Sequence, residues 1–201
     1  MNNVALNKVY EFSGWITKLV YINILWLSYT VFGGIILGFF PATIAMLFVT
    51  KKLILEKNEF NIKNEFTVFF KKEFKKSNKS FYPFIIAGVI LIMDIRFISL
   101  LNFEYSGILI KSFYLLLFLL IMVLLYSLLV YIDGDVGIKK MIKKAILILL
   151  NNPVTNIYIL IGLSLLYSLT VNVAGLFFFF SGSVSSWFLC FTEQKIMRKK
   201  Y

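Results

Sequence analysis

An uncharged stretch from Leu19 to Val49, 31 residues long, constrains the fold of this 201-residue chain more than any other feature. The core of a bilayer is about 30 Å thick and is crossed by about 20 apolar residues in a helix. Of the whole chain, 60% is apolar and 15% charged, against about 45–50% and about 25% in soluble domains. A chain this short cannot bury so much apolar surface in its own core. The sequence therefore predicts an integral membrane protein.

The long uncharged stretch is predicted to form two helices. At about 1.5 Å of rise per residue, it is longer than one upright span requires. Proline disrupts a helix interior, and Gly38 lies three residues before Pro41. We predict one span over 16–37, a break at Gly38–Pro41, and a second helix over 42–57 that is short or re-entrant.

Four further membrane helices are predicted downstream. The apolar stretches 81–101 and 108–132 are each long enough for one span. The stretch 154–191 has 38 residues, which is enough for two spans joined by a tight turn at Asn172–Gly175. An alternative turn at Ser181–Ser183 would leave only eight apolar residues after it.

Three charged residues fall inside the single spans, namely Asp94, Arg96 and Lys111. A charge at the centre of a membrane helix costs about 2.5–3.5 kcal/mol, so these side chains require partners. In one interpretation Asp94 pairs with Lys111, Arg96 pairs with Glu104 of the connecting loop, and the pairs fix helix packing. In the other, the charges form a polar pocket that recognises a ligand or a partner.

The basic residues predict the topology. Segments 1–18, 50–80, 133–153 and 192–201 contain two, nine, four and four Lys or Arg, out of 21 in the chain. Cytoplasmic loops carry the excess of Lys and Arg. All four segments face the cytoplasm if the chain is one membrane domain over 1–201 with six membrane helices, five plus a short or re-entrant one. Both termini of this multi-pass cell-membrane protein are then cytoplasmic. The alternative has five spans and an external N-terminus.

Two of the basic segments are predicted to form amphipathic helices, over 64–76 and 136–150. In the first, phenylalanines recur at helical spacing on one side, lysines occupy the other, and Asn64 is the expected N-cap. We expect both helices to lie in the membrane interface with their lysines toward lipid phosphates, or to dock a partner. The lysines concerned are Lys71, Lys72, Lys75, Lys76, Lys139, Lys140, Lys143 and Lys144.

The sequence supplies few groups for catalysis or metal binding. It contains no histidine, and its single cysteine, Cys190, lies in an apolar run and is expected to serve packing. Asp133-Gly134-Asp135 begins like a calcium loop, but the later ligand positions are missing. A net charge of +11, concentrated on one membrane face, suits anionic lipids rather than nucleic acid. We therefore expect an all-α membrane protein with no enzyme activity, cofactor, metal or nucleic-acid partner.

Several segments, taken in order, resemble a known family. They are Asn23-Ile24-Leu25-Trp26-Leu27, the run from Gly38 to Met46, Lys51-Lys52, the run from Phe69 to Asn78, and a lysine-rich helix leading into Asn152-Pro153. In this order they resemble the YesL family, small bacterial membrane proteins of unknown function. The resemblance implies an accessory role in carbohydrate uptake and no catalytic residues.

Two functions fit these features. The first is a non-enzymatic accessory or assembly subunit of an ABC-type carbohydrate importer. A partner would hydrolyse the ATP, because this chain has no Walker-type glycine-rich loop. The alternative is a small transporter that acts alone or as a homo-oligomer, with Gly38 and Pro41 in a broken-helix binding element.

Overall fold

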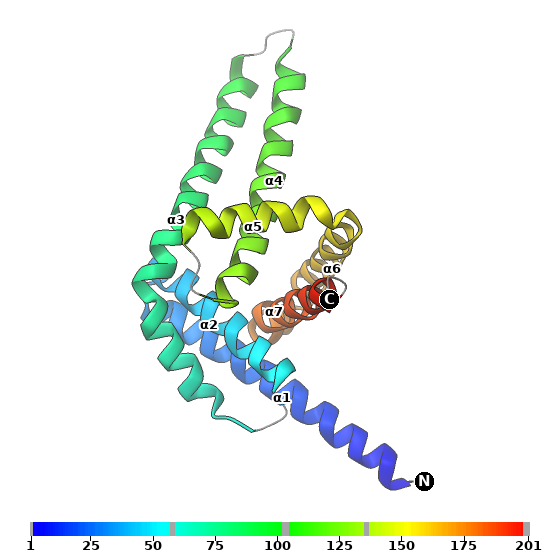
Figure 1. Cartoon of the computed structure of the whole chain (residues 1–201). Coiled ribbons are helices and arrows are strands. Elements are labelled where there is room, and N and C mark those ends of the chain that lie inside the picture. Colours follow the sequence, from blue (N-terminus) through cyan, green and yellow to red (C-terminus); the bar gives the residue numbers. More distant parts are fainter. Residues whose placement is uncertain (1, 57–58, 102–104, 135–136, 199–201) are drawn as a thin grey trace. The chain divides into compact units, whose positions relative to one another are not determined.

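The computed structural model describes the chain except for residues 1, 57–58, 102–104, 135–136 and 199–201 (Figure 1). In the described part the chain is all-α, as predicted, and forms seven helices. They are α1 (Asn2–Phe32), α2 (Ile36–Leu55), α3 (Ile62–Leu101), α4 (Ser106–Ile132), α5 (Ile138–Asn151), α6 (Pro153–Asn172) and α7 (Ala174–Arg198).

Five helices in the described part are long and apolar enough to cross a membrane. They are Phe12–Phe32 of α1, then α2, α3, α4 and α6. The prediction of a polytopic helical membrane protein is therefore confirmed. A sixth membrane helix in the region of α7 and the cytoplasmic location of both termini stay predictions.

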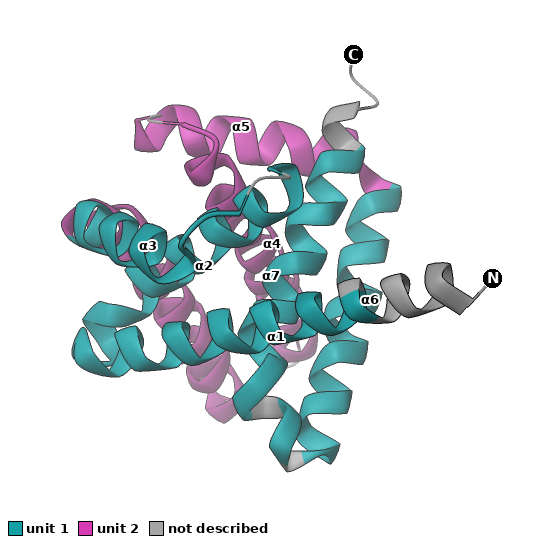
Figure 2. Ribbon diagram, turned by 90° about the horizontal axis from the view of Figure 1, so that it is seen from below, with its two compact units in different colours: residues 1–74, 154–201 teal, residues 75–153 magenta. Residues whose placement is uncertain are grey.

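The chain forms two compact units (Figure 2). Unit 1 contains residues 1–74 and 154–201, and unit 2 contains residues 75–153. In unit 1, α1, α2 and α7 pack against one another, and in unit 2, α4 packs against α5. One membrane domain over 1–201 stays a prediction.

The break in the first apolar stretch lies at Gly33–Ile35, so its predicted position at Gly38–Pro41 is wrong. Gly34 has φ +85°, the left-handed conformation that favours glycine. The N–H of Gly34 donates to the Val31 carbonyl and that of Ile35 to the Thr30 carbonyl, at 3.0 and 2.9 Å. These two bonds form a Schellman motif, which ends α1 before any proline is reached.

Gly38 and Pro41 both lie inside α2 rather than in a break. Pro41 is the sixth residue of the helix, and as a proline it has no N–H to donate to the Leu37 carbonyl. A Cβ at Gly33 would come within 2.5 Å of the Gly38 Cα. The two glycines therefore allow α1 and α2 to touch backbone to backbone just after the turn.

The predicted helix over 64–76 and the predicted span over 81–101 are one helix, α3, which has 40 residues and contains Pro83. The prediction of two separate helices is therefore wrong. The N-cap is Asn61 rather than Asn64, because Asn61 Oδ1 accepts the Asn64 N–H at 3.0 Å. Lys52 Nζ, at the end of α2, pairs with Glu65 Oε1 at 2.9 Å and ties the start of α3 to α2.

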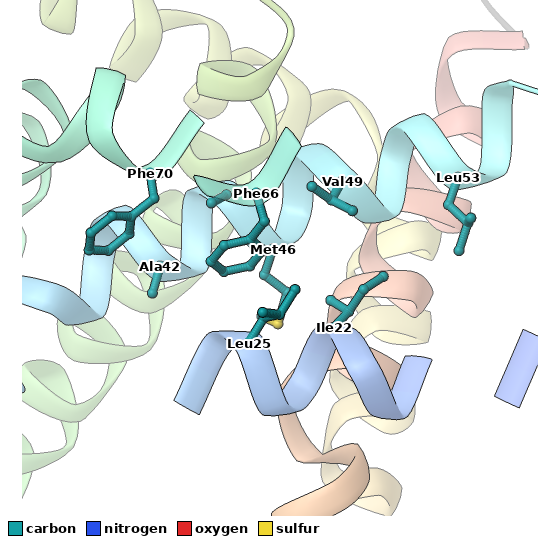
Figure 3. Packing of buried hydrophobic residues seen from close by; sticks show 9 residues of the cluster. Ile22, Leu25, Ala42, Met46, Val49, Leu53, Phe66 and Phe70 are labelled. Atoms are coloured by element: carbon teal, nitrogen blue, oxygen red, sulfur yellow. The ribbon is translucent and has the colours of Figure 1, made fainter. Parts of the chain in front are cut away.

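The phenylalanine side of this segment packs against the rest of unit 1. Phe66 and Phe70 are buried against α1 and α2, and Figure 3 shows Phe66 beside Met46 and Leu25. Tyr29 of α1 adds ring contacts to both phenylalanines, and its hydroxyl forms a 2.6 Å hydrogen bond with the Thr67 hydroxyl. The pattern of the segment indicated a helix correctly, but its apolar side belongs to the core of unit 1. The cluster is Ile22, Leu25, Ala42, Ala45, Met46, Val49, Leu53, Phe66 and Phe70.

The second amphipathic helix is confirmed as α5. Met141, Ala145 and Leu149 are buried, whereas the four lysines of the helix are exposed. The helix ends at Asn151, and Pro153 begins α6. This end was expected, because proline disfavours the helical conformation at the residue before it.

The turn between the last two helices is confirmed at its predicted place. α6 ends at Asn172 and α7 begins at Ala174, and the Val173 N–H donates to the Leu169 carbonyl at 3.1 Å. The alternative turn at Ser181–Ser183 is wrong, because these residues lie inside α7.

Candidate functional site

A line of polar contacts runs between α7 and its two neighbours in unit 1, and we call it the polar seam. Its members are Asn23 of α1, Thr50 and Lys51 of α2, and Ser183, Ser186, Cys190 and Glu193 of α7. Asn23, Thr50, Ser183 and Ser186 are at most 1% exposed. Polar side chains in such apolar helices are costly unless they are bonded, so their partners define the site.

Asn23 binds the backbone of α7. Its Nδ2 donates to the Phe178 carbonyl at 2.6 Å, and its Oδ1 accepts the N–H groups of Gly182 and Ser183 at 2.9 and 3.0 Å. Phe178 and Gly182 are four residues apart on α7. The side chain of Asn23 therefore bonds both a carbonyl and an N–H group that are separated by one helical turn.

Gly182 makes room for the Asn23 side chain. A Cβ at Gly182 would lie 3.0 Å from Asn23 Oδ1, 3.1 Å from Met46 Sδ and 3.1 Å from the Trp26 ring. Small residues at membrane helix interfaces allow such close approach. The Ser181-Gly182-Ser183 sequence is therefore a contact point of three helices and not a turn.

The contacts between α2 and α7 continue along both helices. The hydroxyls of Thr50 and Ser186 share a hydrogen bond of 2.8 Å, and the Cys190 thiol donates to the Leu47 carbonyl at 3.7 Å. Cys190 is fully buried, which agrees with the packing role expected for it. The hydroxyl oxygens of Ser181 and Ser183 are buried with no hydrogen-bond partner among the described residues.

An ion pair forms the last contact of the polar seam, near the C-terminal end of α2. Lys51 Nζ lies 2.9 Å from Glu193 Oε2, and their side chains are 18% and 8% exposed. This degree of burial weakens solvent screening, so the pair contributes more than a surface ion pair would. The seam therefore fixes α7 against α1 and α2 through an amide, two hydroxyls, a thiol and an ion pair.

We expect a double-mutant cycle to detect this ion pair. Glu193→Gln or Lys51→Met alone should lower the free energy of unfolding by about 2 kcal/mol, because a charged hydrogen bond is lost and the remaining charge stays largely buried. Removing both charges should recover part of that loss. Thermal unfolding in a mild detergent measures the effect, and strictly additive losses would contradict a direct pair.

The charges predicted inside the membrane do not form the expected pair. Asp94 on α3 is half-buried, and Arg96 on α3 and Lys111 on α4 are exposed. No ion pair joins Asp94 to Lys111 in the described part of the chain. Glu104 lies outside the described residues. A ligand or partner role for Asp94, Arg96 and Lys111 stays a prediction.

The lysines predicted to face lipid or a partner are all at the surface. Each of the eight is exposed, on α3 for the first four and on α5 for the rest. Lys76 Nζ lies 5.9 Å from the centre of the Tyr131 ring, and Lys72 Nζ lies 3.9 Å from Glu73 Oε1. No group of three or more His, Cys, Asp or Glu that could hold a metal is present among the described residues. The eight are Lys71, Lys72, Lys75, Lys76, Lys139, Lys140, Lys143 and Lys144.

Comparison with known proteins finds a family match for the N-terminal part of the chain and distant relatives over most of its length. Residues 19–95 match "Protein of unknown function, DUF624". The uncharacterized protein YesL of Bacillus subtilis (strain 168) is 25% identical over 198 residues, which cover 98% of this chain and 93% of YesL. The uncharacterized protein YesV of the same organism is 28% identical over 181 residues, 90% of this chain and 86% of YesV.

A third relative, the uncharacterized protein YteU of Bacillus subtilis (strain 168), is 31% identical over 133 residues, which cover 64% of this chain and 59% of YteU. No solved structure matches the chain significantly. The matched region 19–95 contains Asn23, Thr50 and Lys51 of the polar seam and the α1–α2 turn. This polytopic helical membrane protein is a distant homologue of YesL and YesV over most of its length, and its residues 19–95 match the DUF624 family model.

Proposed function

We propose that this protein is a non-enzymatic accessory or assembly subunit of a carbohydrate (ABC-type) uptake system in the bacterial cytoplasmic membrane. Its two basic helical segments and both termini face the cytoplasm. The carbohydrate part of the proposal rests on the resemblance to the YesL family.

The exposed lysines of α3 and α5 are the observation that carries the proposal. Many polar groups inside unit 1 are engaged in bonds within or between helices, for example the three bonds of Asn23 to α7. The charged groups at the surface are therefore the ones that can contact another protein. Clusters of one sign of charge favour a partner of the opposite sign and set the orientation of docking.

Affinity purification from the native bacterium in a mild detergent tests this proposal. We expect subunits of a carbohydrate importer to co-purify in a fixed ratio. Their yield should fall when Lys71, Lys72, Lys75 and Lys76 are replaced by Gln. Replacing the exposed Lys18 and Lys63, two lysines outside the two clusters, is the control and should leave the yield unchanged.

Two outcomes would overturn the proposal. One is the absence of any importer subunit from the purified complex. The other is sugar flux through liposomes that contain this protein alone, which would favour the stand-alone or homo-oligomeric transporter.

A further inference from the structure

An apolar groove runs between α3 and α4 within unit 2. It has a volume of about 470 Å³, within the range of about 300–1,000 Å³ that is typical of ligand pockets. Phe84 and Leu91 line it from α3, and Leu119 and Val123 line it from α4. Ile142 of α5 also lines it. The rest of the lining is also apolar, so the groove suits a hydrocarbon chain.

A second groove of about 400 Å³ lies along α5 and shares Ile142 with the first. Lys139 and Lys143, one helical turn apart, line it together with Ile146 and Leu147. The two grooves therefore share Ile142, and the hydrocarbon stems of Lys139 and Lys143 line only the second groove.

The charge of α5 selects the kind of ligand. The helix carries four lysines and no acidic residue. Only two of the four, Lys139 and Lys143, line the groove, whereas Lys140 and Lys144 do not. Lysine ammonium groups are compact charges that bind phosphate, and basic clusters next to membrane helices bind anionic lipids.

We propose that the two grooves together form a binding site for one anionic phospholipid. An acyl chain lies between α3 and α4, and the phosphate of the headgroup contacts Lys139 and Lys143. Ile142 packs at the junction of the headgroup and the chain. The site belongs to unit 2 alone and does not depend on the proposed transport role.

The test uses the full-length protein, purified and delipidated in a neutral detergent, and titrated with phosphatidylglycerol while its thermal unfolding midpoint is followed. We expect a saturable rise of the midpoint. Phosphatidylcholine with the same acyl chains should have a much weaker effect, and inorganic phosphate should have none.

Variants of α5 distinguish a specific binding site from a general attraction of anionic lipid to a basic helix. Lys139→Gln with Lys143→Gln should raise the half-saturating phosphatidylglycerol concentration about 25-fold, because each lysine beside an anionic lipid contributes roughly a fivefold change in affinity. Lys140→Gln with Lys144→Gln removes the same charge from the same helix outside the groove and should leave the titration nearly unchanged.

A pair of tryptophan substitutions tests the apolar groove. Leu119→Trp should fill it and abolish the saturable rise, whereas Ile121→Trp, which is exposed on α4 and does not line the groove, should preserve it. Equal losses in the two lysine double variants, or equal effects of the two phospholipids, would overturn the proposal. A rise produced by inorganic phosphate alone would do the same, because the ligand would then be a free anion.

Discussion

Replacing Asn23 by aspartate should destabilise the protein by about 3–5 kcal/mol, the cost of leaving a buried charge unpaired. The two side chains have nearly the same shape. The native amide nitrogen donates to the Phe178 carbonyl at 2.6 Å, and a carboxylate would place an acceptor oxygen against that carbonyl. The new charge would lie at a position where the native residue is fully buried. The unfolding midpoint in a mild detergent measures the loss.

Asn23→Ala is the control, and its effect should be smaller, about 1–3 kcal/mol. Without the amide, the Gly182 N–H and the Phe178 carbonyl can bond to each other as ordinary helix partners, so fewer groups stay unsatisfied. A larger loss in the alanine variant than in the aspartate variant would contradict the bonding described for Asn23.

The spans and the amphipathic α5 could be predicted from the sequence because both depend on local patterns. The length of an apolar stretch reports whether it can cross a bilayer, and Met141, Ala145 and Leu149 recur at helical spacing. The end of α5 before Pro153 follows from the restriction that proline places on the preceding residue. None of these inferences requires knowledge of a neighbouring helix.

The polar seam could not be predicted, because its bonds join residues far apart in the sequence. Asn23 and Ser183 are separated by 160 positions, and Thr50 and Ser186 by 136. The only features in the sequence that hinted at the polar seam were an asparagine inside an apolar stretch and the small residues clustered in α7. Ser181–Ser183 suggested a turn because glycine and serine are common in turns. The same small residues also allow helices to approach closely, and only the packing decides between the two.

The position of the first break was mispredicted for a related reason. Pro41 is the stronger helix breaker by intrinsic propensity, but α2 continues through it, with Pro41 as the sixth residue of the helix. Gly34 in the left-handed conformation ends α1 seven residues earlier. Gly38 was assigned to a break, and it serves instead as a contact between the two helices.

Gly38→Ala should therefore lower the free energy of unfolding by about 3 kcal/mol, the upper end of the usual cost of overpacking. A Cβ at Gly38 would be forced against the Thr30 carbonyl oxygen and would lie 3.0 Å from the Gly33 Cα. Both neighbours are backbone atoms. The Thr30 carbonyl also accepts the Ile35 N–H at 2.9 Å, so moving it would open the turn itself. Thermal unfolding in detergent measures this effect.

Two other glycines calibrate this loss. Gly34→Ala meets no atom within 4 Å but keeps φ at +85°, so it should cost about 1–2 kcal/mol from backbone strain alone. Gly14→Ala also meets no atom within 4 Å and lies inside α1, where alanine is favoured by about 1 kcal/mol. The order of stability should be Gly14→Ala, then Gly34→Ala, then Gly38→Ala. If Gly38→Ala were as stable as Gly14→Ala, the close backbone contact between α1 and α2 would not exist.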